Sequence, residues 1–290
     1  MTNHQIAKAA ASHQIPRIVS PRGMLEPWAM RYRRWKKSLA WLLYQRRDLA
    51  SAAALHATSE TEANSIRNFK LGREVFVVPN GVTLPQNMPK VREASAPNAN
   101  QTSSPEARIA VFLSRVHPKK GLPLLVEAWS RVRPEGWKMH VIGPDECGHR
   151  GEIESLARRL KLEESWHFFD SVEGNEKWRR LSEAELMILP TYSENFGNVI
   201  AESLAVATPV ITTTGTPWQG LEQRQCGWWV SPNSDQLEHA LRAATSTSKE
   251  ELQKMGIRGQ EWINAEFSWD RIAAQMVEIY KSLLSKATPA

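Results

Sequence analysis

Residues 189–211, LPTYSENFGNVIAESLAVATPVI, decide the fold of this chain. They begin at the end of a short apolar run over 186–189, and a polar loop separates this run from an amphipathic segment that starts at Asn198. A Thr-Pro pair ends the amphipathic segment, and a Val-Ile pair opens another apolar run. Strand, loop, helix and strand in this order are typical of a βαβ unit in a parallel sheet.

Two carboxylates and a helix start lie within this unit. Glu194 belongs to the loop before the helix, and Glu202 belongs to its second turn. The helix begins with the backbone N–H groups of Gly197, Asn198 and Val199, and N–H groups at a helix start attract anions. Acids on both sides of such an anion site fit a ligand with hydroxyls at its ends and phosphate in the middle, as in a nucleotide-sugar. Glutamates near a helix start are also common simply because they interact favourably with the helix dipole.

A basic cluster, SRVHPKKG, occupies residues 114–121 directly after an apolar run over 109–113. Arg115 precedes the turn and Lys120 follows it, so both cations can reach a diphosphate from the carboxyl end of a parallel strand. A solvated basic loop is the competing interpretation of this string. We interpret His117 as a turn residue.

Strands and helices alternate along the chain, which predicts an α/β fold with doubly wound parallel sheets. The expected strands lie at 17–20, 55–57, 75–78, 109–113, 139–142, 166–169, 186–189, 210–211 and 227–230. The expected helices include 5–13, 27–48, 122–132, 152–162 and 176–183, and Thr58-Ser59-Glu60 is expected to cap a helix that runs to residue 69. Residues 85–105 are rich in Pro, Asn, Ser, Ala and Gln without periodicity, which indicates a flexible linker.

Composition excludes several classes of protein. The 290 residues are 41% hydrophobic and 23% charged, with a formal net charge of +6. This modest excess fits an anionic ligand or a membrane surface, and nucleic-acid binding is not expected because no recognition motif accompanies it. Two cysteines are too few for a disulfide framework or a zinc cluster. We expect a cytoplasmic protein, because no apolar run reaches the ~20 residues of a bilayer span and the first residues lack a signal core.

Taken together, these motifs resemble the donor site of retaining glycosyltransferases of the GT-B fold, family 4. The resemblance extends from about residue 15 to about residue 280. Its sharpest points are the two glutamates with seven residues between them, the Arg/Lys pair, Pro79-Asn80-Gly81 and Thr216-Pro217-Trp218. It implies a complete C-terminal Rossmann-like domain, preceded by an N-terminal Rossmann-like domain that is truncated.

The resemblance implies a catalytic group of three residues. Arg115 and Lys120 would hold the phosphates of the donor, and Glu194 would face its sugar and stabilise an oxocarbenium-like state. The two cations and the helix start would stabilise the leaving diphosphate, so no metal and no other cofactor is required. The implied reaction transfers a hexose from a UDP- or GDP-sugar to a hydroxyl of a saccharide or lipid-linked acceptor with retention. Its implied place is the biosynthesis of cell-surface polysaccharide or lipopolysaccharide.

The resemblance also implies a set of donor-binding residues. Glu202 would bind the ribose hydroxyls of the nucleotide. The sugar pocket and phosphate contacts would come from Asn195, Phe196, Gly197, Asn198 and Val199, and Val172 lies where the family holds the base.

The chain departs from the family pattern at several sites, among them Asp170-Ser171, which replaces a stretch where Gly is common. The family pattern has several strands before the helix expected at 5–13, so the resemblance implies that the N-terminal domain is truncated here. Pro21-Arg22-Gly23 replaces a His of many relatives, so Arg22 is a candidate acceptor-side residue or a structural loop arginine. Ala207 stands where a Gly is usual, which is unfavourable if the helix ends in a left-handed turn.

These observations divide the chain into four parts. We predict a partial N-terminal acceptor-side domain at 1–84, a linker at 85–106, a C-terminal nucleotide-sugar-binding domain at 107–268, and a final helix at 269–286 that crosses back to the N-terminal domain. The alternative to an active transferase is a nucleotide-sugar-binding subunit with weak or no activity, which a partner chain completes.

The basic, Trp-rich helix at 27–48 allows two interpretations. Such helices lie on anionic lipids, which would place the protein peripherally at the inner face of the cell membrane. The commoner explanation is a helix that packs beside the acceptor cleft and exposes a solvated outer face.

Overall fold

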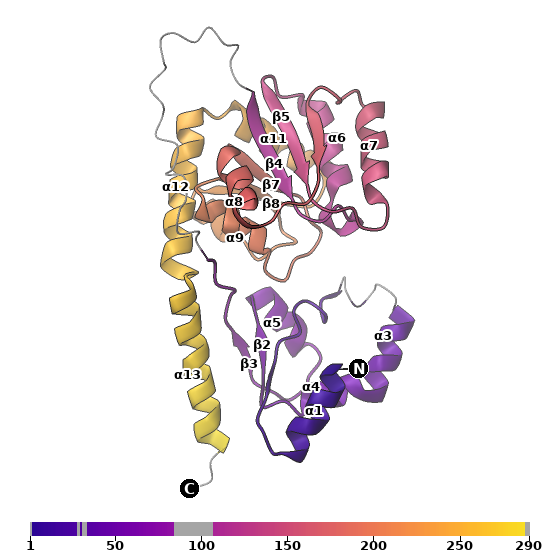
Figure 1. Ribbon diagram of the computed structural model, residues 1–290, viewed down its shortest axis with the longest axis vertical. Coiled ribbons are helices and arrows are strands. Elements are labelled where there is room, and N and C mark those ends of the chain that lie inside the picture. Colours follow the sequence, from indigo (N-terminus) through magenta and orange to yellow (C-terminus); the bar gives the residue numbers. More distant parts are fainter. Residues whose placement is uncertain (1, 28–29, 31–33, 84–106, 288–290) are drawn as a thin grey trace. The chain divides into compact units, whose positions relative to one another are not determined.

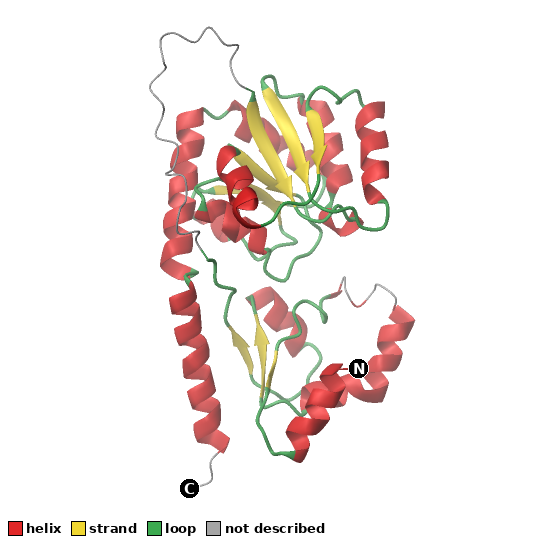
Figure 2. Cartoon of the chain, in the orientation of Figure 1, coloured by secondary structure: helices red, strands yellow, loops and turns green. Residues whose placement is uncertain are grey.

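The computed structural model of the chain describes residues 2–27, 30, 34–83 and 107–287. The chain forms two compact units (Figures 1 and 2): unit 1 comprises Met1–Gly81 with Phe267–Ala290, and unit 2 comprises Val82–Glu266. The linker predicted at 85–106 lies outside the described residues. None of the helices in the described ranges combines the length and the apolar character that crossing a bilayer needs.

Unit 2 alternates strands with helices, as the sequence pattern predicts. Its strands are β4 (Arg108–Leu113), β5 (Trp137–Ile142), β6 (Trp166–Phe169), β7 (Leu186–Leu189), β8 (Val210–Thr213) and β9 (Gly227–Val230). Its helices are the 3₁₀ turn η2 (Pro118–Lys120), α6 (Leu122–Val132), α7 (His149–Arg159), α8 (Gly174–Glu183), α9 (Asn198–Ala205), α10 (Gly220–Gln223), α11 (Ser234–Ser246) and α12 (Lys249–Glu266). The helix expected at 152–162 begins and ends three residues earlier, because Gly148 adopts a left-handed φ of 74° and starts the helix there.

The six strands of unit 2 form one parallel sheet in the order β6-β5-β4-β7-β8-β9. The chain builds outward from β4 to β6, returns to place β7 beside β4, and then builds outward in the other direction. Helices cover both faces (Figure 1): α6 contacts α7 and α11, whereas α9 contacts α8 and α12. Helices that leave two adjacent strands toward opposite faces open a crevice at the carboxyl ends of those strands. Here the two strands are β4 and β7.

The centre of this sheet is apolar on both faces. All four residues of β7 and all four of β8 are buried. Strands that are covered on both sides by helices are continuous apolar runs rather than alternating ones, which is why the sequence marks these strands clearly. The core that results holds the loops at the carboxyl ends in place.

The end of α9 is a left-handed turn at a residue that is not glycine. Ala207 has a φ of 59°, the conformation that the sequence marked as unfavourable for alanine. The turn packs against α12 at Gly256, where a Cβ would collide with the carbonyl oxygen of Ala207. The absence of a side chain at Gly256 therefore lets α12 approach the turn closely.

Unit 1 has a three-stranded parallel sheet in the order β1-β2-β3. Its strands are β1 (Ile18–Val19), β2 (Ala54–Ala57) and β3 (Val75–Val77). Its helices are α1 (Thr2–Ser12), α3 (Arg34–Ala40), the π-helical turn η1 (Trp41–Gln45), α4 (Arg46–Ala50), α5 (Glu60–Arg67) and α13 (Trp269–Ala287). The strand expected at 17–20 is shorter and only half-buried. Ser59 caps α5 as predicted, since its hydroxyl accepts the N–H of Glu62.

The long helix predicted at 27–48 is interrupted in the structure. A π-helical turn, η1, separates α3 from α4, so the described part of this segment is not one regular helix. Residues 28–29 and 31–33 of the predicted helix lie outside the described residues.

Replacing Ala207 by Gly should stabilise unit 2. The left-handed conformation costs alanine more than glycine, and the net gain expected in the free energy of unfolding is about 0.5–1 kcal/mol. Urea unfolding of the two proteins measures it. The matched control is Ala205→Gly, two residues earlier and inside α9, which should destabilise by about 1 kcal/mol. Equal destabilisation by both substitutions would contradict the account of this turn.

Histidine 140 should make unit 2 sensitive to acid. Partial burial, and secondly the neighbouring His167, lower the pKa of His140 from 6.5 to about 4. As the pH falls from 6.5 to about 4, the unfolded chain binds a proton that the folded chain rejects, so stability is lost in this window. His140→Phe should reduce the loss, measured as the change in melting temperature across this range. His239→Phe, at an exposed position of α11, is the control, and an unchanged slope in His140→Phe would refute the assignment.

Candidate functional site

The loops that follow β4 and β7 are joined by direct contacts. Gly121, which ends η2 with a φ of 71°, lies so close to β7 that a Cβ would collide with the carbonyl oxygen of Pro190. The carbonyl oxygen of Lys119 accepts hydrogen bonds from the N–H of Tyr192 at 2.9 Å and from the hydroxyl of Thr191 at 3.1 Å. These contacts bring the residue that precedes Gly121, Lys120, to the loop that carries Glu194.

Lys120 and Glu194 form a largely buried ion pair between these two loops. Lys120 Nζ lies 2.5 Å from Glu194 Oε1, and the two side chains are only 10% and 13% exposed. The hydroxyl oxygen of Thr191 also lies 3.1 Å from the same carboxylate oxygen, which competes with the Lys119 carbonyl oxygen for the one hydroxyl proton. Burial of two charges costs desolvation energy that their attraction often fails to offset, so such a pair is weak evidence of a role in stability alone.

The loop with Glu194 is also fixed from the side of β8. The backbone N–H of Glu194 donates to the carbonyl oxygen of Gly215 at 2.8 Å, and the hydroxyl of Thr213 donates to the carbonyl oxygen of Thr191. Gly215 approaches the backbone of Tyr192 so closely that a Cβ would lie 2.5 Å from its carbonyl oxygen. The position of the Glu194 carboxylate is therefore set by backbone contacts on two sides.

The start of α9 packs directly against Glu194. Gly197 is the N-cap residue, with a φ of 82° that strongly favours glycine. A Cβ there would lie 3.6 Å from Glu194 Cγ and 3.1 Å from Ile200 Cδ1. The helix start, with Asn198 and Val199 as its first two residues, thus lies beside the ion pair.

Phe196 lies in the core, although the sequence analysis expected it to line a sugar pocket. Its residue is 4% exposed, and its ring centroid is 5.2 Å from that of Trp218. The indole N–H of Trp218 donates to the carbonyl oxygen of Phe196 at 2.5 Å, and Trp218 in turn packs on Trp262. The sequence analysis singles out Thr216-Pro217-Trp218, but it does not predict that Trp218 supports the loop at Phe196. Asn195, the residue before Phe196, is half-buried in the same loop.

Glu202 and Arg115 each have a charged partner that the sequence did not predict. Glu202 pairs with Lys177 of α8 at 2.8 Å, with both side chains partly exposed. Arg115 is 59% exposed and pairs with Glu146, in the loop after β5, at 2.7 Å. The structure therefore brings Lys120 and Glu194 into contact, whereas Arg115 pairs with Glu146 and Glu202 pairs with Lys177. Val172 is half-buried in the loop between β6 and α8.

His117 acts as the predicted turn residue. Its Nδ1 accepts the backbone N–H of Lys119 at 3.0 Å and so caps η2. Partial burial is the main cause that lowers the pKa of His117 below its usual value, and the charges of Arg115 and Lys120 act in the same direction. The imidazole is therefore neutral at neutral pH, which its role as an acceptor requires.

Arg22 belongs to unit 1, where the carboxyl ends of β1, β2 and β3 meet. Its guanidinium donates to Asn80 Oδ1 at 2.8 Å. The buried carboxylate of Glu62 fixes this loop, because it accepts the N–H of Gly23 at 2.6 Å and that of Thr58 at 2.8 Å. Arg22 is thus an exposed cation on a rigid loop.

A buried histidine joins the same three strands. His56 Nδ1 lies 2.8 Å from the hydroxyl of Ser20, and Nε2 lies 2.8 Å from the carbonyl oxygen of Val78. Since a carbonyl oxygen only accepts, we assign the proton to Nε2 and the acceptor role to Nδ1. In the part of the chain that the structure describes, no group of three or more His, Cys, Asp or Glu side chains is placed to hold a metal ion.

Curated relatives of the chain are glycosyltransferases. The D-inositol 3-phosphate glycosyltransferase of Geodermatophilus obscurus is 24% identical over 227 residues, which is 75% of this chain and 49% of that protein. The MMP alpha-(1->4)-mannosyltransferase of Mycolicibacterium hassiacum is 26% identical over 87% of this chain and 61% of its own length. The chain therefore spans about half to three fifths of the length of these relatives.

Solved structures show the same fold. Sucrose-phosphate synthase from Thermosynechococcus elongatus has a TM-score of 0.73 at 23% identity, covering 86% of this chain and 62% of its own. Anabaena HepE in complex with UDP has a TM-score of 0.74 at 18% identity, covering 97% of this chain and 76% of its own. These similarities, together with the two parallel sheets, confirm the predicted α/β fold of the GT-B type.

The family models cover almost all of the described chain. The model of the glycosyl transferase 4-like domain matches residues 2–81. That of glycosyl transferases group 1 matches residues 96–262, which is more than half of the chain. The chain belongs to the glycosyl transferases group 1 family, as the motifs around Glu194 and Lys120 predicted.

Proposed function

We propose that the crevice at the carboxyl ends of β4 and β7 binds a UDP- or GDP-linked hexose, and that the protein transfers the hexose to a hydroxyl acceptor with retention. The observation that carries this proposal is the buried Lys120–Glu194 pair beside the start of α9. It places a cation, an acid and helix N–H groups where doubly wound sheets bind their ligands. The solved structures of HepE with UDP and with UDP-glucose support a donor of this class.

Lys120 would stabilise the leaving diphosphate. A diphosphate in the crevice offers Lys120 a new anionic partner, and its negative charge grows as the bond to the sugar breaks. A cation that is fixed in a water-poor crevice stabilises such developing charge without reorganisation. Arg115 is exposed enough to leave Glu146 and add a second cation, and the N–H groups at the start of α9 complete the site.

Glu194 and Glu202 would bind opposite ends of the donor. When the phosphate engages Lys120, the Glu194 carboxylate can accept hydrogen bonds from the sugar and stabilise a positive charge at its anomeric carbon. Glu202, held by Lys177 on α8, would accept the ribose hydroxyls. In this scheme cationic side chains and backbone dipoles carry out the charge stabilisation, and no metal ion or other cofactor is required. The acceptor would be a saccharide or a lipid-linked hydroxyl bound with the help of Arg22.

A nucleotide-sugar-binding subunit that needs a partner chain is the second candidate. The sheet of unit 1 has three strands, and its edge strand β1 is only two residues long. Such a sheet offers limited backbone for an acceptor site and leaves an edge to which another chain can add. Binding of the donor without transfer, restored by a second polypeptide, would distinguish this candidate from a self-sufficient transferase.

Lys120→Ala should weaken nucleotide binding. Loss of the charge-assisted contact to the diphosphate is expected to lower the affinity for UDP or GDP roughly tenfold or more, as measured by calorimetry. Lys138→Ala, on an exposed lysine at the opposite end of β5, is the matched control and should bind as the unmodified protein does. Melting curves check that the variant still folds, because Glu194 loses its buried partner. The proposal fails if the unmodified protein binds neither nucleotide.

Glu194→Gln should separate binding from chemistry. The amide keeps the shape of the side chain but cannot stabilise a positive charge, so turnover of the nucleotide-sugar is expected to fall about 100-fold or more. The affinity for free UDP or GDP should change much less, because the nucleotide does not contact this group in the proposed scheme. A donor-hydrolysis assay with a panel of UDP- and GDP-sugars measures the turnover. Glu163→Gln, in an exposed loop, is the control. Undiminished turnover in Glu194→Gln would exclude the assigned role.

A further inference from the structure

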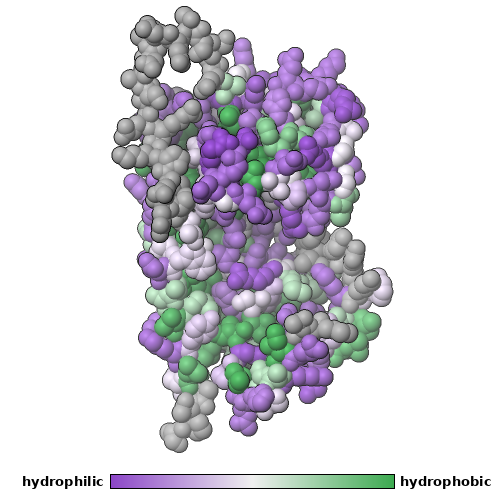
Figure 3. Space-filling model, in the orientation of Figure 1, coloured by the Kyte–Doolittle hydropathy of each residue, from purple (hydrophilic) through white to green (hydrophobic). Residues whose placement is uncertain are grey.

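One side of the α3–η1–α4 segment in unit 1 exposes large apolar side chains. Trp35, Leu39, Leu42 and Leu43 are 70%, 52%, 82% and 68% exposed. Spacings of three and four residues place them along one side of the segment. Apolar surface that gathers in this way marks a site of interaction with a membrane or another molecule. In Figure 3, apolar side chains are visible over this part of unit 1.

Two of these side chains, Leu42 and Leu43, belong to the π-helical turn η1. In η1 the backbone N–H of Arg46 donates to the carbonyl oxygen of Trp41, five residues earlier, which widens the turn. Trp41 packs inward, with its ring centroid 4.7 Å from that of Phe69, while Leu42 and Leu43 remain outside. Turns of this type occur frequently at functional positions. Trp41 thus anchors the segment, and its two successors face solvent.

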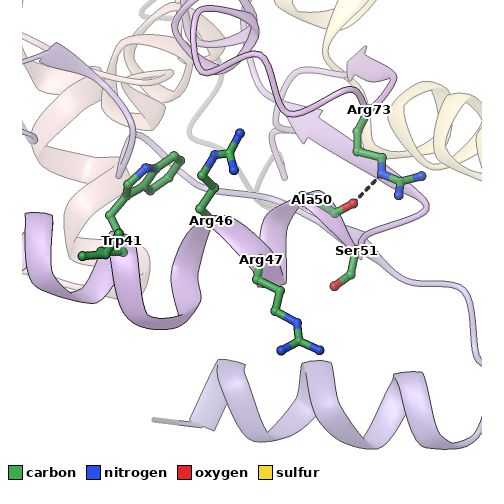
Figure 4. Close-up of a pocket in the computed structure, with 7 residues that line it drawn as sticks. Trp41, Arg46, Arg47, Ala50, Ser51 and Arg73 are labelled. Carbon is green, nitrogen blue, oxygen red and sulfur yellow. Dashed lines mark hydrogen bonds between the residues drawn. The ribbon is translucent and has the colours of Figure 1, made fainter.

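Three arginines are among the residues that line a pocket beside Leu42. The pocket is lined by Leu42, Arg46, Arg47 and Arg73, among others, and Figure 4 shows the guanidinium groups of Arg46 and Arg47 pointing away from each other. Arg46 and Arg47 are exposed and make no ion pair within the described ranges. Arg73 donates to the carbonyl oxygen of Ala50 at 2.5 Å.

The acids that adjoin these arginines in sequence already have partners. Asp48 lies 2.8 Å from His4, and Glu74 lies 3.2 Å from Lys286. Among the described residues, the positive charge of Arg46 and Arg47 is therefore left without an acidic partner and is available to a ligand. Guanidinium groups bind phosphate oxygens in a two-pronged geometry, so the chemistry that fits is a phosphate-rich surface.

We propose that this surface, Trp35, Leu39, Leu42 and Leu43 with Arg46, Arg47 and Arg73, docks unit 1 on an anionic phospholipid bilayer. Unpaired cations adjacent to exposed Trp and Leu side chains match the interface of a bilayer, where phosphates lie above acyl chains. A polypeptide partner would account for the apolar side chains but would need acids of its own to meet the arginines. The docking surface is separate from the donor crevice of unit 2, so the proposal does not depend on the proposed function.

Vesicle co-sedimentation of the full chain tests the proposal. The probes are vesicles of phosphatidylcholine alone and vesicles that also contain phosphatidylglycerol. We expect the protein to bind the anionic vesicles, and raised salt to weaken this binding. Arg46→Gln with Arg47→Gln should lower the affinity about fivefold for each arginine, or about 30-fold together. Leu42→Ser with Leu43→Ser should lower it roughly tenfold or more, even at low salt.

Matched controls come from unit 2. Arg158→Gln with Arg159→Gln removes two adjacent exposed arginines at the end of α7, and Ile257→Ser removes an exposed apolar side chain of α12. Both controls should bind as the unmodified protein does. All substituted side chains are exposed, so the melting temperature should not change, and its measurement separates lost binding from misfolding.

Four results would overturn the proposal. They are equal binding to neutral and anionic vesicles, no binding to either, unchanged binding of both docking-surface variants, or equal losses in the α7 control. Self-association that Leu42→Ser with Leu43→Ser abolishes, without any vesicle binding, would assign the surface to a second copy of the chain instead.

Discussion

The reversal of strand order between β4 and β7 is the constraint on which the rest of the structure depends. Because α6 and α9 leave these neighbouring strands toward opposite faces, their loops face each other at the carboxyl edge of the sheet. Lys120 comes from one loop and Glu194 from the other, 74 positions later, and the topology brings them within 2.5 Å. No local feature of either loop creates this pair.

The crevice is held by backbone more than by side chains. Gly121 and Gly215 allow close approach of neighbouring carbonyl groups, and Gly197 takes a left-handed conformation beside Glu194. A side chain at any of these glycines would move one of the loops that hold the ion pair. The buried pair between Phe196 and Trp218 supports the same loop from the core.

The sequence predicts the strands of unit 2 well and the side-chain partners poorly. The strand Leu186–Leu189 has the predicted bounds because helices cover both sides of the sheet at its centre, which selects an uninterrupted apolar run. The Glu202–Lys177 and Arg115–Glu146 pairs were missed because each joins separate elements, and several basic or acidic residues nearby could serve equally well. The direction of the Phe196 ring depends on Trp218, which lies 22 positions away. The π turn at Trp41 changes the helical period too briefly for a pattern of apolar residues to reveal it.

In the proposed donor site, the Lys120–Glu194 pair would limit the kinds of anion that can bind. The carboxylate is tethered beside the lysine and therefore competes with any incoming anion at a high local concentration. A small inorganic anion gains one cation but leaves a buried acid without its counter-charge. In the proposed function, a ligand that carries hydroxyl donors as well as phosphate would satisfy both groups at once, whereas a simple inorganic salt would not.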